Sequence, residues 1–228
     1  MEGEVLKGEI ITALYSFGCP ELKQFGAEKF IFNFIRNPTK SKIAQVRTIL
    51  QRLEPYLFYE LIAKKNKLSP LDLKVVKAHW LGNELLKKIE KEDIKECFPK
   101  ILSHDMRILK IVDLIGGLPH HNFDALWILK KTKKLTRPLQ EEITNCLIRT
   151  GRIIEIKGGK ISVETEKIDF DNLCLTKSIE EISRFFLKEI KTGDFVSIHF
   201  KRAREKISLQ TAKNLKKITQ EALLFFER

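Results

Sequence analysis

The sequence predicts an α+β protein in which an N-terminal helical domain is followed by a small OB-like β-barrel with a C-terminal helix. Hydrophobic residues recur at helical spacing through the first half of the chain. The spacing changes to alternation after Cys146, in "RIIEIKGGKISVET", which has a Gly-Gly pair at its centre. We therefore expect a helical domain in residues 1–118, a connector in residues 119–144, and the barrel with its closing helix in residues 145–228.

Prolines and polar caps mark the helix boundaries expected in the first half. Pro20 is expected at the start of a helix, and Pro55 is expected to end or kink the helix before it. Ser69 and Pro70 are expected as the N-cap and the first residue of the helix in "SPLDLKVVKAHWLGNELLKKI". A further helix is expected from about Asp105 to a Gly-Gly stop.

The alternating segment after Cys146 predicts a β-hairpin. Strands are expected at about 150–157 and about 160–166. Gly158-Gly159 is expected to supply the positive φ angles of a two-residue turn between them.

Three more elements are expected before the end of the chain. "SIEEISRFFLKEI" predicts a helix or a helical insertion capped by Ser178. "GDFVSIHF" predicts a strand through Val196–His199, opened by a Gly-Asp turn. An amphipathic helix capped by Ser208 is expected to close the barrel domain.

The composition is that of a folded, basic protein. The 228 residues carry a net charge of +12, but Lys and Glu are interleaved almost everywhere, which is typical of solvated helix faces and disfavours nucleic acid as the main partner. No stretch has the pattern of a signal peptide or a membrane-spanning helix, so we expect a cytoplasmic protein with no membrane partner. Four cysteines, expected to stay reduced, lie far apart at Cys19, Cys97, Cys146 and Cys174.

An ordered set of features in the last part of the chain resembles a known family. Cys146-Leu147 precedes the first strand, "GRIIEI", and "GDFVSIHFKRA" precedes the closing helix. This order resembles the HypC/HupF family of [NiFe]-hydrogenase maturation chaperones, which are small OB-like barrels with a cysteine before the first strand and a late motif G-D-Y/F-V-x-V/I-H-x-G-x-A. The residues in register with that motif are Gly193, Asp194, Phe195, Val196, His199 and Ala203.

The resemblance implies a maturation chaperone rather than an enzyme. Its partners would be a hydrogenase large-subunit precursor and a maturation scaffold protein, and Cys146 and His199 would transiently hold an iron centre. A thiolate and a neutral imidazole suit low-spin iron, and we expect the sulfur to be partly accessible and within about 8 Å of the imidazole. The chain departs from the family because Cys146 is internal, because no proline follows it, and because Lys201 replaces a glycine. The whole chain also resembles an uncharacterised prokaryotic family, through "HWLGNELL" and "LPHHNF".

A second candidate metal site consists of His120 and His121, which follow Pro119, together with His79. Adjacent histidines in a loop can face one cavity, so this group supports an alternative function, a metal-dependent activity centred on His120-His121. Nucleic-acid binding on the barrel face is a further alternative, although "RIIEIKGGKISVET" has no aromatic residue on which a base could stack. The sequence has no HExxH, no nucleotide-binding glycine motif and no serine-hydrolase motif.

Overall fold

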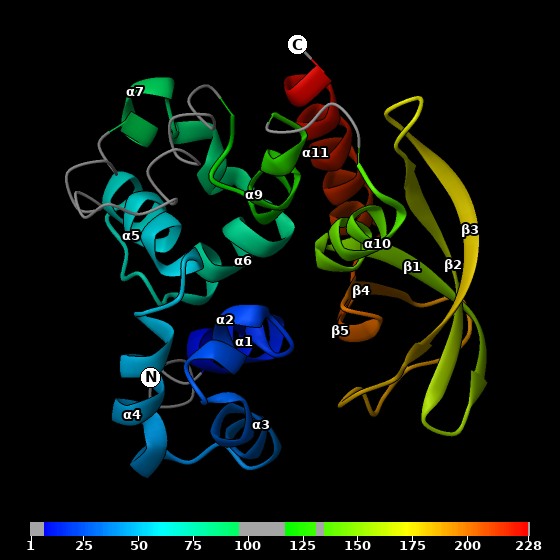
Figure 1. Ribbon diagram of the computed structural model, residues 1–228. Coiled ribbons are helices and arrows are strands. Elements are labelled where there is room, and N and C mark those ends of the chain that lie inside the picture. The colour runs from blue at the N-terminus through cyan, green and yellow to red at the C-terminus, as the bar shows by residue number, and fades with distance from the viewer. Residues whose placement is uncertain (1–6, 96–116, 131–134, 228) are drawn as a thin grey trace. The chain divides into compact units, whose positions relative to one another are not determined.

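The computed structural model describes residues 7–95, 117–130 and 135–227, which form two compact units (Figure 1). The first unit, Met1–His120, is helical, and the second, His121–Arg228, contains the barrel. The predicted α+β fold class, with N-terminal helices, a closed barrel and a C-terminal helix, is confirmed. Within the described ranges, no helix has both the length and the apolar character that crossing a bilayer demands.

The helical unit consists of short helices joined by tight turns. They are α1 (Lys7–Ser16), α2 (Pro20–Gln24), α3 (Glu28–Arg36), η1 (Lys40–Lys42), α4 (Ile43–Leu50), α5 (Pro55–Asn66), α6 (Leu73–Leu81), η2 (Glu84–Lys88) and α7 (Lys91–Lys95). Pro20 and Pro55 are the first residues of α2 and α5, a position where the missing N–H breaks no helical hydrogen bond. The predicted cap Ser69 is wrong, because Asp72 caps α6 by accepting a hydrogen bond of 2.8 Å from the backbone N–H two residues later. The helix predicted from Asp105 lies outside the described residues.

The core of the helical unit combines stacked aromatic rings with a close backbone approach. The Trp80 ring stacks on Tyr15 at 5.1 Å between centroids, and the Trp80 indole N–H donates to the Tyr59 hydroxyl. Burial raises the pKa of Tyr59, so its phenol stays neutral. On α1, Gly8 lies so near the chain before α6 that a Cβ there would stand 1.7 Å from the carbonyl oxygen of Leu71. Only a glycine fits at this contact.

The second unit contains a closed five-stranded barrel. Its strands are β1 (Arg149–Lys157), β2 (Lys160–Asp169), β3 (Cys174–Ser183), β4 (Phe195–His199) and β5 (Arg202–Ile207). They pair in the order β1-β2-β3-β5-β4, antiparallel except for the β3–β5 contact that completes the ring. Alternate residues point inward and form the barrel core, which comprises Ile153, Ile161, Val163, Ile182, Val196, Ile198 and Ala203.

Two tight turns set the register of neighbouring strands. The predicted β1–β2 turn is present, with Gly158 at a φ of +57° and Gly159 outside the left-handed region, as in a type II′ turn. The β4–β5 turn also has two residues, Phe200 at +50° and Lys201 at +55°, as in a type I′ turn. Neither is a glycine, so this turn holds two side chains in a conformation that most residues avoid.

The helix predicted for "SIEEISRFFLKEI" is wrong, because β3 occupies the first half of that segment. Ser178 lies in mid-strand opposite Thr165 of β2, and the pairing with β2 continues without a break to Ser183. The segment that follows has no helix, and Phe185 has a φ of +53°. Long-range pairing with β2 therefore overrides the local helical pattern.

In the described part of the second unit, four helical elements accompany the barrel. The predicted connector contains α9 (His121–Leu126) and η4 (Trp127–Lys130), and α10 (Arg137–Cys146) begins in it and ends two residues beyond it. The predicted closing helix is present as α11 (Leu209–Glu227), and Ser208 caps it by accepting a hydrogen bond of 3.0 Å from a backbone N–H of the first turn.

A buried ion pair joins β1 to β3 on the inner side of the barrel. Arg149 and Glu180 are only 6% and 11% exposed and share two hydrogen bonds, of 3.1 and 2.9 Å. Lys167 also contacts the Glu180 carboxylate at 2.8 Å. Burial raises the pKa of Glu180, but the hydrogen bonds and charges of Arg149 and Lys167 outweigh burial and leave the pKa below its usual value.

Acid is expected to destabilise the barrel through Glu180. Because the folded-state pKa is lowered, the stabilisation is present above the usual value of 4.5 and is lost as the pH falls through the lower folded-state pKa. Midpoints of thermal unfolding measured from pH 7 to pH 3 should therefore fall less steeply below pH 4.5 for Glu180→Gln than for the unchanged chain. The control is Glu181→Gln, on the exposed side of the same strand, which should keep the unchanged slope. Equal slopes for all three proteins would contradict the role of Glu180.

Candidate metal site

Three possible metal ligands come from three separate elements of the second unit. His121 is the first residue of α9, Cys146 is the last residue of α10, and His199 is the last residue of β4. Cys146 and His199 are the pair predicted from the sequence, and His121 joins them in the folded chain.

The ligand atoms of these three residues all lie within 4.8 Å of one another. The Cys146 sulfur is 3.7 Å from Nε2 of His121, and the His121 and His199 rings are 5.2 Å apart between centroids, nearly perpendicular. His121 and His199 are buried, whereas Cys146 is partly exposed. The geometry therefore meets the expected separation below about 8 Å and the expected accessibility of the sulfur. The role of these residues as ligands remains a prediction.

Hydrogen bonds to backbone carbonyl oxygens hold the ends of the three elements together. The N–H of Phe200, the residue after His199, donates to the carbonyl oxygen of Asn145, the residue before Cys146, at 2.7 Å. Nε2 of His121 lies 2.9 Å from the carbonyl oxygen of Cys146 itself. The β4–β5 turn and the start of α9 are thus both tied to the last turn of α10.

Asn122 adds a second anchor for α9. Its side-chain oxygen accepts a hydrogen bond of 2.9 Å from the Ile148 N–H, and its side-chain nitrogen lies 2.9 Å from the Ile148 carbonyl oxygen. The same nitrogen donates to the hydroxyl of Thr219 on α11 at 2.8 Å. Asn122 is fully buried, so these bonds hold His121 against the chain that follows Cys146.

A thiolate and two imidazoles are a ligand set suited to a transition metal. In tetrahedral zinc sites the metal lies about 2.3 Å from sulfur and about 2.0–2.1 Å from nitrogen, which places those ligand atoms about 3.6 Å apart. The 3.7 Å between the Cys146 sulfur and Nε2 of His121 is already close to that separation. To bind a metal, Nε2 would exchange its hydrogen bond with the Cys146 carbonyl oxygen for the metal. Soft sulfur with imidazole favours zinc, copper or iron over magnesium and calcium. The three residues therefore fit such an ion.

The histidines of the second candidate site have different environments. His79 is buried in the helical unit, with its ring stacked on Phe58 at 5.3 Å and Nδ1 3.0 Å from the carbonyl oxygen of Pro119. His120 is also buried. Among the described residues, the metal-ligand group includes His121 but neither His79 nor His120. The fold thus brings His121 together with Cys146 and His199, and the group of His79, His120 and His121 stays a prediction.

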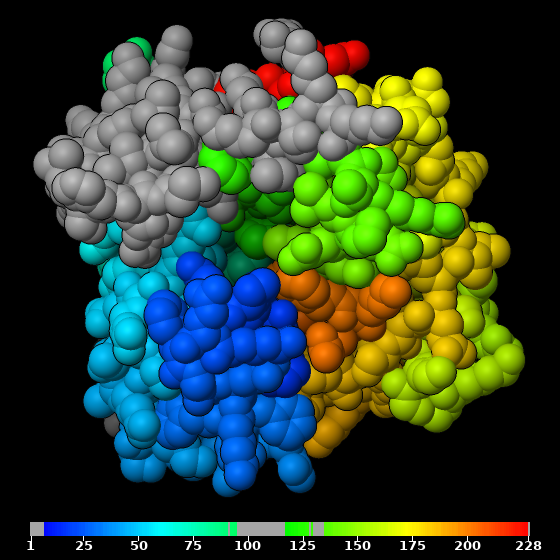
Figure 2. Space-filling view, in the orientation of Figure 1, coloured from blue at the N-terminus to red at the C-terminus, as the bar shows by residue number. Residues whose placement is uncertain are grey.

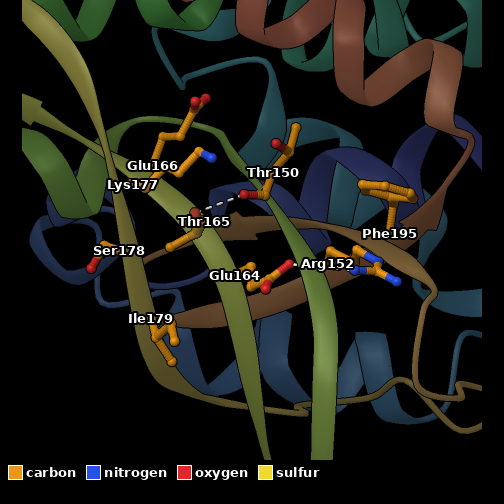
Figure 3. Close-up of a pocket in the computed structure, with 9 residues that line it drawn as sticks. All are labelled: Thr150, Arg152, Glu164, Thr165, Glu166, Lys177, Ser178, Ile179 and Phe195. Atoms are coloured by element: carbon orange, nitrogen blue, oxygen red, sulfur yellow. Dashed lines mark hydrogen bonds and ion pairs between the residues drawn. The ribbon is translucent and has the colours of Figure 1, made fainter.

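A groove of about 560 Å³ crosses the outer face of the barrel (Figure 3). It lies over β1, β2 and β3, with Phe195 of β4 at one end and Ile179 of β3 at the other. Arg152 and Glu164, which line it, approach each other to 3.5 Å across the two central strands. One aromatic residue and balanced charges give the groove little in common with a base-stacking surface, and nucleic-acid binding stays an untested prediction.

The comparisons with known proteins give a family but no activity. No curated protein and no solved structure matches the chain. The HypC/HupF resemblance is therefore not supported by them, whereas the predicted membership of an uncharacterised family is confirmed. Residues 6–228 match the model of a family described as a family of unknown function, DUF6390, and the chain belongs to that family.

Proposed function

We propose that the chain binds a transition-metal ion through His121, Cys146 and His199 and delivers it to a partner protein. The observation that carries the proposal is the convergence of three ligand atoms within 4.8 Å from three separate elements. Such a convergence places a soft donor beside two borderline donors, the combination that selects a late transition metal.

The arrangement suits temporary rather than permanent binding. Structural zinc sites are closed by four protein ligands, whereas three ligands leave a position for an outside group. Cys146 is the ligand that is partly exposed, so an incoming ligand would reach the metal on the sulfur side. A metal held in this way can be exchanged without unfolding the barrel.

A small cavity between the segments that carry Cys146 and His199 offers a partner a place to enter. About 260 Å³ of space lies between α10 and the barrel end, bordered by Asn145 next to Cys146 and by Lys201 two residues after His199. A side chain that filled this space would contact Asn145 and Lys201, which are close in sequence to the ligands but are not ligands themselves.

The specific form of the proposal comes from the resemblance to the HypC/HupF chaperones. The cargo is then an iron centre, the partners are a maturation scaffold protein and a [NiFe]-hydrogenase large-subunit precursor, and the chain has no catalytic activity of its own. Cys146 and His199 occupy the family's cysteine and histidine positions, and His121 supplies a third donor that could complete part of the iron coordination.

Capture of the client protein tests this specific form. The full-length tagged chain is expressed in its own organism and recovered without oxygen, and the hydrogenase large-subunit precursor is expected to co-purify with it. Cys146→Ala should reduce the recovered precursor by about tenfold or more at equal chain level, because the removed thiolate is the strongest donor of the site.

The matched control is Cys174→Ala, which removes an exposed cysteine outside the ligand group and should recover the precursor normally. Equal recovery with Cys146→Ala would refute a role for the thiolate in client binding. Metal binding without any precursor would leave the metal site intact and defeat the hydrogenase assignment.

A further inference from the structure

Within the described residues, no second strand pairs with the outer edge of β3 along most of its length. On one side, β3 pairs with β2 through all ten of its residues. On the other side, within the described residues, its strand pairing is the single contact between Ser183 and Arg202 of β5. The edge of residues 174–182 therefore presents backbone N–H and C=O groups that another strand could use.

Of the features that prevent sheets from joining, this edge has charged side chains at Lys177, Glu180 and Glu181 but has neither a proline nor a bulge. Its sequence, "CLTKSIEEIS", contains no proline, and its pairing with β2 has no register shift, whereas a shift occurs in both β1–β2 and β4–β5. Ile179 lies in its middle and is 68% exposed, the most exposed of the large hydrophobic residues described. Figure 2 shows the β3 region of the chain at the molecular surface.

We propose that this edge pairs with the same edge of a second copy of the chain, antiparallel about a two-fold axis through Ile179. Side chains alternate along a strand, so Lys177, Ile179 and Glu181 share the outer face. An antiparallel pairing centred on Ile179 places the two Ile179 side chains opposite each other. It also places each Lys177 opposite the Glu181 of the other copy.

The self-complementary order of charges is what selects a second copy as the occupant. A two-fold interface uses the same surface on both copies. A residue a given number of positions before the axis therefore meets the residue the same number of positions after it on the other copy. Lys177 and Glu181 each lie two residues from Ile179, so each Lys177 meets the Glu181 of the other copy. Both of these contacts join opposite charges and are attractive. In the described structure Glu181 contacts Lys160 at 2.5 Å, but both side chains are more than half exposed and can exchange partners.

The pairing is expected to be weak. A short two-stranded contact buries much less than the roughly 800 Å² per partner of a stable complex, so dissociation constants on the order of 10–100 µM are expected. Ile179 lines one end of the groove of Figure 3. Pairing of β3 with a second copy would extend the sheet beyond that end of the groove.

Charge reversal tests the register. Sedimentation of the full chain from about 5 to 300 µM should reveal a monomer–dimer equilibrium in the range expected for a small interface. Lys177→Glu alone should weaken the dimer by about tenfold or more, because it creates two like-charge contacts at once. Adding Glu181→Lys to it should restore the dimer, since the order of charges is then simply inverted. Lys217→Glu on α11 makes the same change in net charge and should leave the equilibrium unaltered.

A disulfide tests the axis directly. Opposed residues in antiparallel strands have Cα atoms about 4.5–5.5 Å apart, within the range that a disulfide spans. In a Cys174→Ser background, Ile179→Cys should therefore form a covalent dimer on mild oxidation. Glu181→Cys should not, because its symmetry mate lies four positions out of register, about 13 Å along the strand. The Cys174→Ser chain, with neither Ile179→Cys nor Glu181→Cys, serves as the control for crosslinks formed through the remaining cysteines.

Three results would overturn the proposal. The first is a chain that stays monomeric at 300 µM, which would leave the edge to a different protein or to no partner. The second is equal crosslinking of the Ile179→Cys and Glu181→Cys variants, which would signify random collision. A dimer that Lys177→Glu leaves unchanged would likewise exclude this register.

Discussion

Replacing Cys146 with serine is expected to weaken transition-metal binding by more than about 100-fold, because the change removes the one thiolate of the three-ligand group. Titration of the reduced chain with cobalt(II) is a suitable measurement, since a cobalt–thiolate bond produces a charge-transfer absorption that a cobalt–imidazole bond lacks. His121→Ala and His199→Ala should each weaken binding while keeping that absorption. The barrel should unfold at nearly the unchanged temperature in Cys146→Ser, because the sulfur is partly exposed.

The exposed cysteine of β3 provides the control for this experiment. Cys174→Ser makes the same chemical change outside the ligand group and should leave the cobalt affinity and spectrum unaltered. If His121→Ala bound cobalt as tightly as the unchanged chain, the site would be reduced to the Cys146–His199 pair predicted from the sequence. If Cys146→Ser kept the affinity, the metal site itself would be rejected.

Gly8→Ala is expected to destabilise the helical unit by about 3 kcal/mol, which lies in the upper range for single substitutions. The added Cβ would stand 1.7 Å from the Leu71 carbonyl oxygen, and a backbone oxygen cannot turn aside as a side chain can. Either α1 or the chain before α6 must shift, and the aromatic packing of Trp80 on Tyr15 shifts with it. Thermal unfolding followed by helical circular dichroism measures the effect.

Gly159 serves as a control that distinguishes a steric conflict at Gly8 from a general effect of replacing glycine with alanine on stability. Gly159 has no atom within 4 Å of the position a Cβ would take, and its φ lies outside the left-handed region. Gly159→Ala should therefore change stability by less than about 0.5 kcal/mol. Comparable losses in Gly8→Ala and Gly159→Ala would contradict the close approach of α1 to Leu71.

The parts of the fold that the sequence predicted correctly are those determined by short-range patterns. The β1–β2 hairpin has alternating residues around Gly158, and α11 has a serine cap before an amphipathic run, so each is specified within a few residues. The segment of β3 is different, because Ile179 and Ile182 are three residues apart, a helical spacing, yet they lie on opposite faces of the strand. Pairing with β2, which is fixed only in the folded barrel, decides between the two.

The site was predictable only in part, for a related reason. Cys146 and His199 could be proposed as a pair because their order relative to the strands resembles a known family. His121 lies outside the segment that resembles that family. Its place beside Cys146 depends on hydrogen bonds from α9 to residues about 25 positions away. The motif that contains His121 could be recognised in the sequence, but its partners depend on tertiary contacts that no local pattern encodes.

The bond from the Phe200 N–H to the Asn145 carbonyl oxygen has a consequence for how the site changes during evolution. A bond between two main-chain groups does not depend on which side chain either residue carries. Mutations at both positions can therefore accumulate while Cys146 and His199 stay adjacent. During sequence divergence, the residues around the ligands should then be substituted faster than the ligands themselves. For detecting remote relatives of this chain, the order and spacing of the metal-binding residues should be more informative than overall percentage identity.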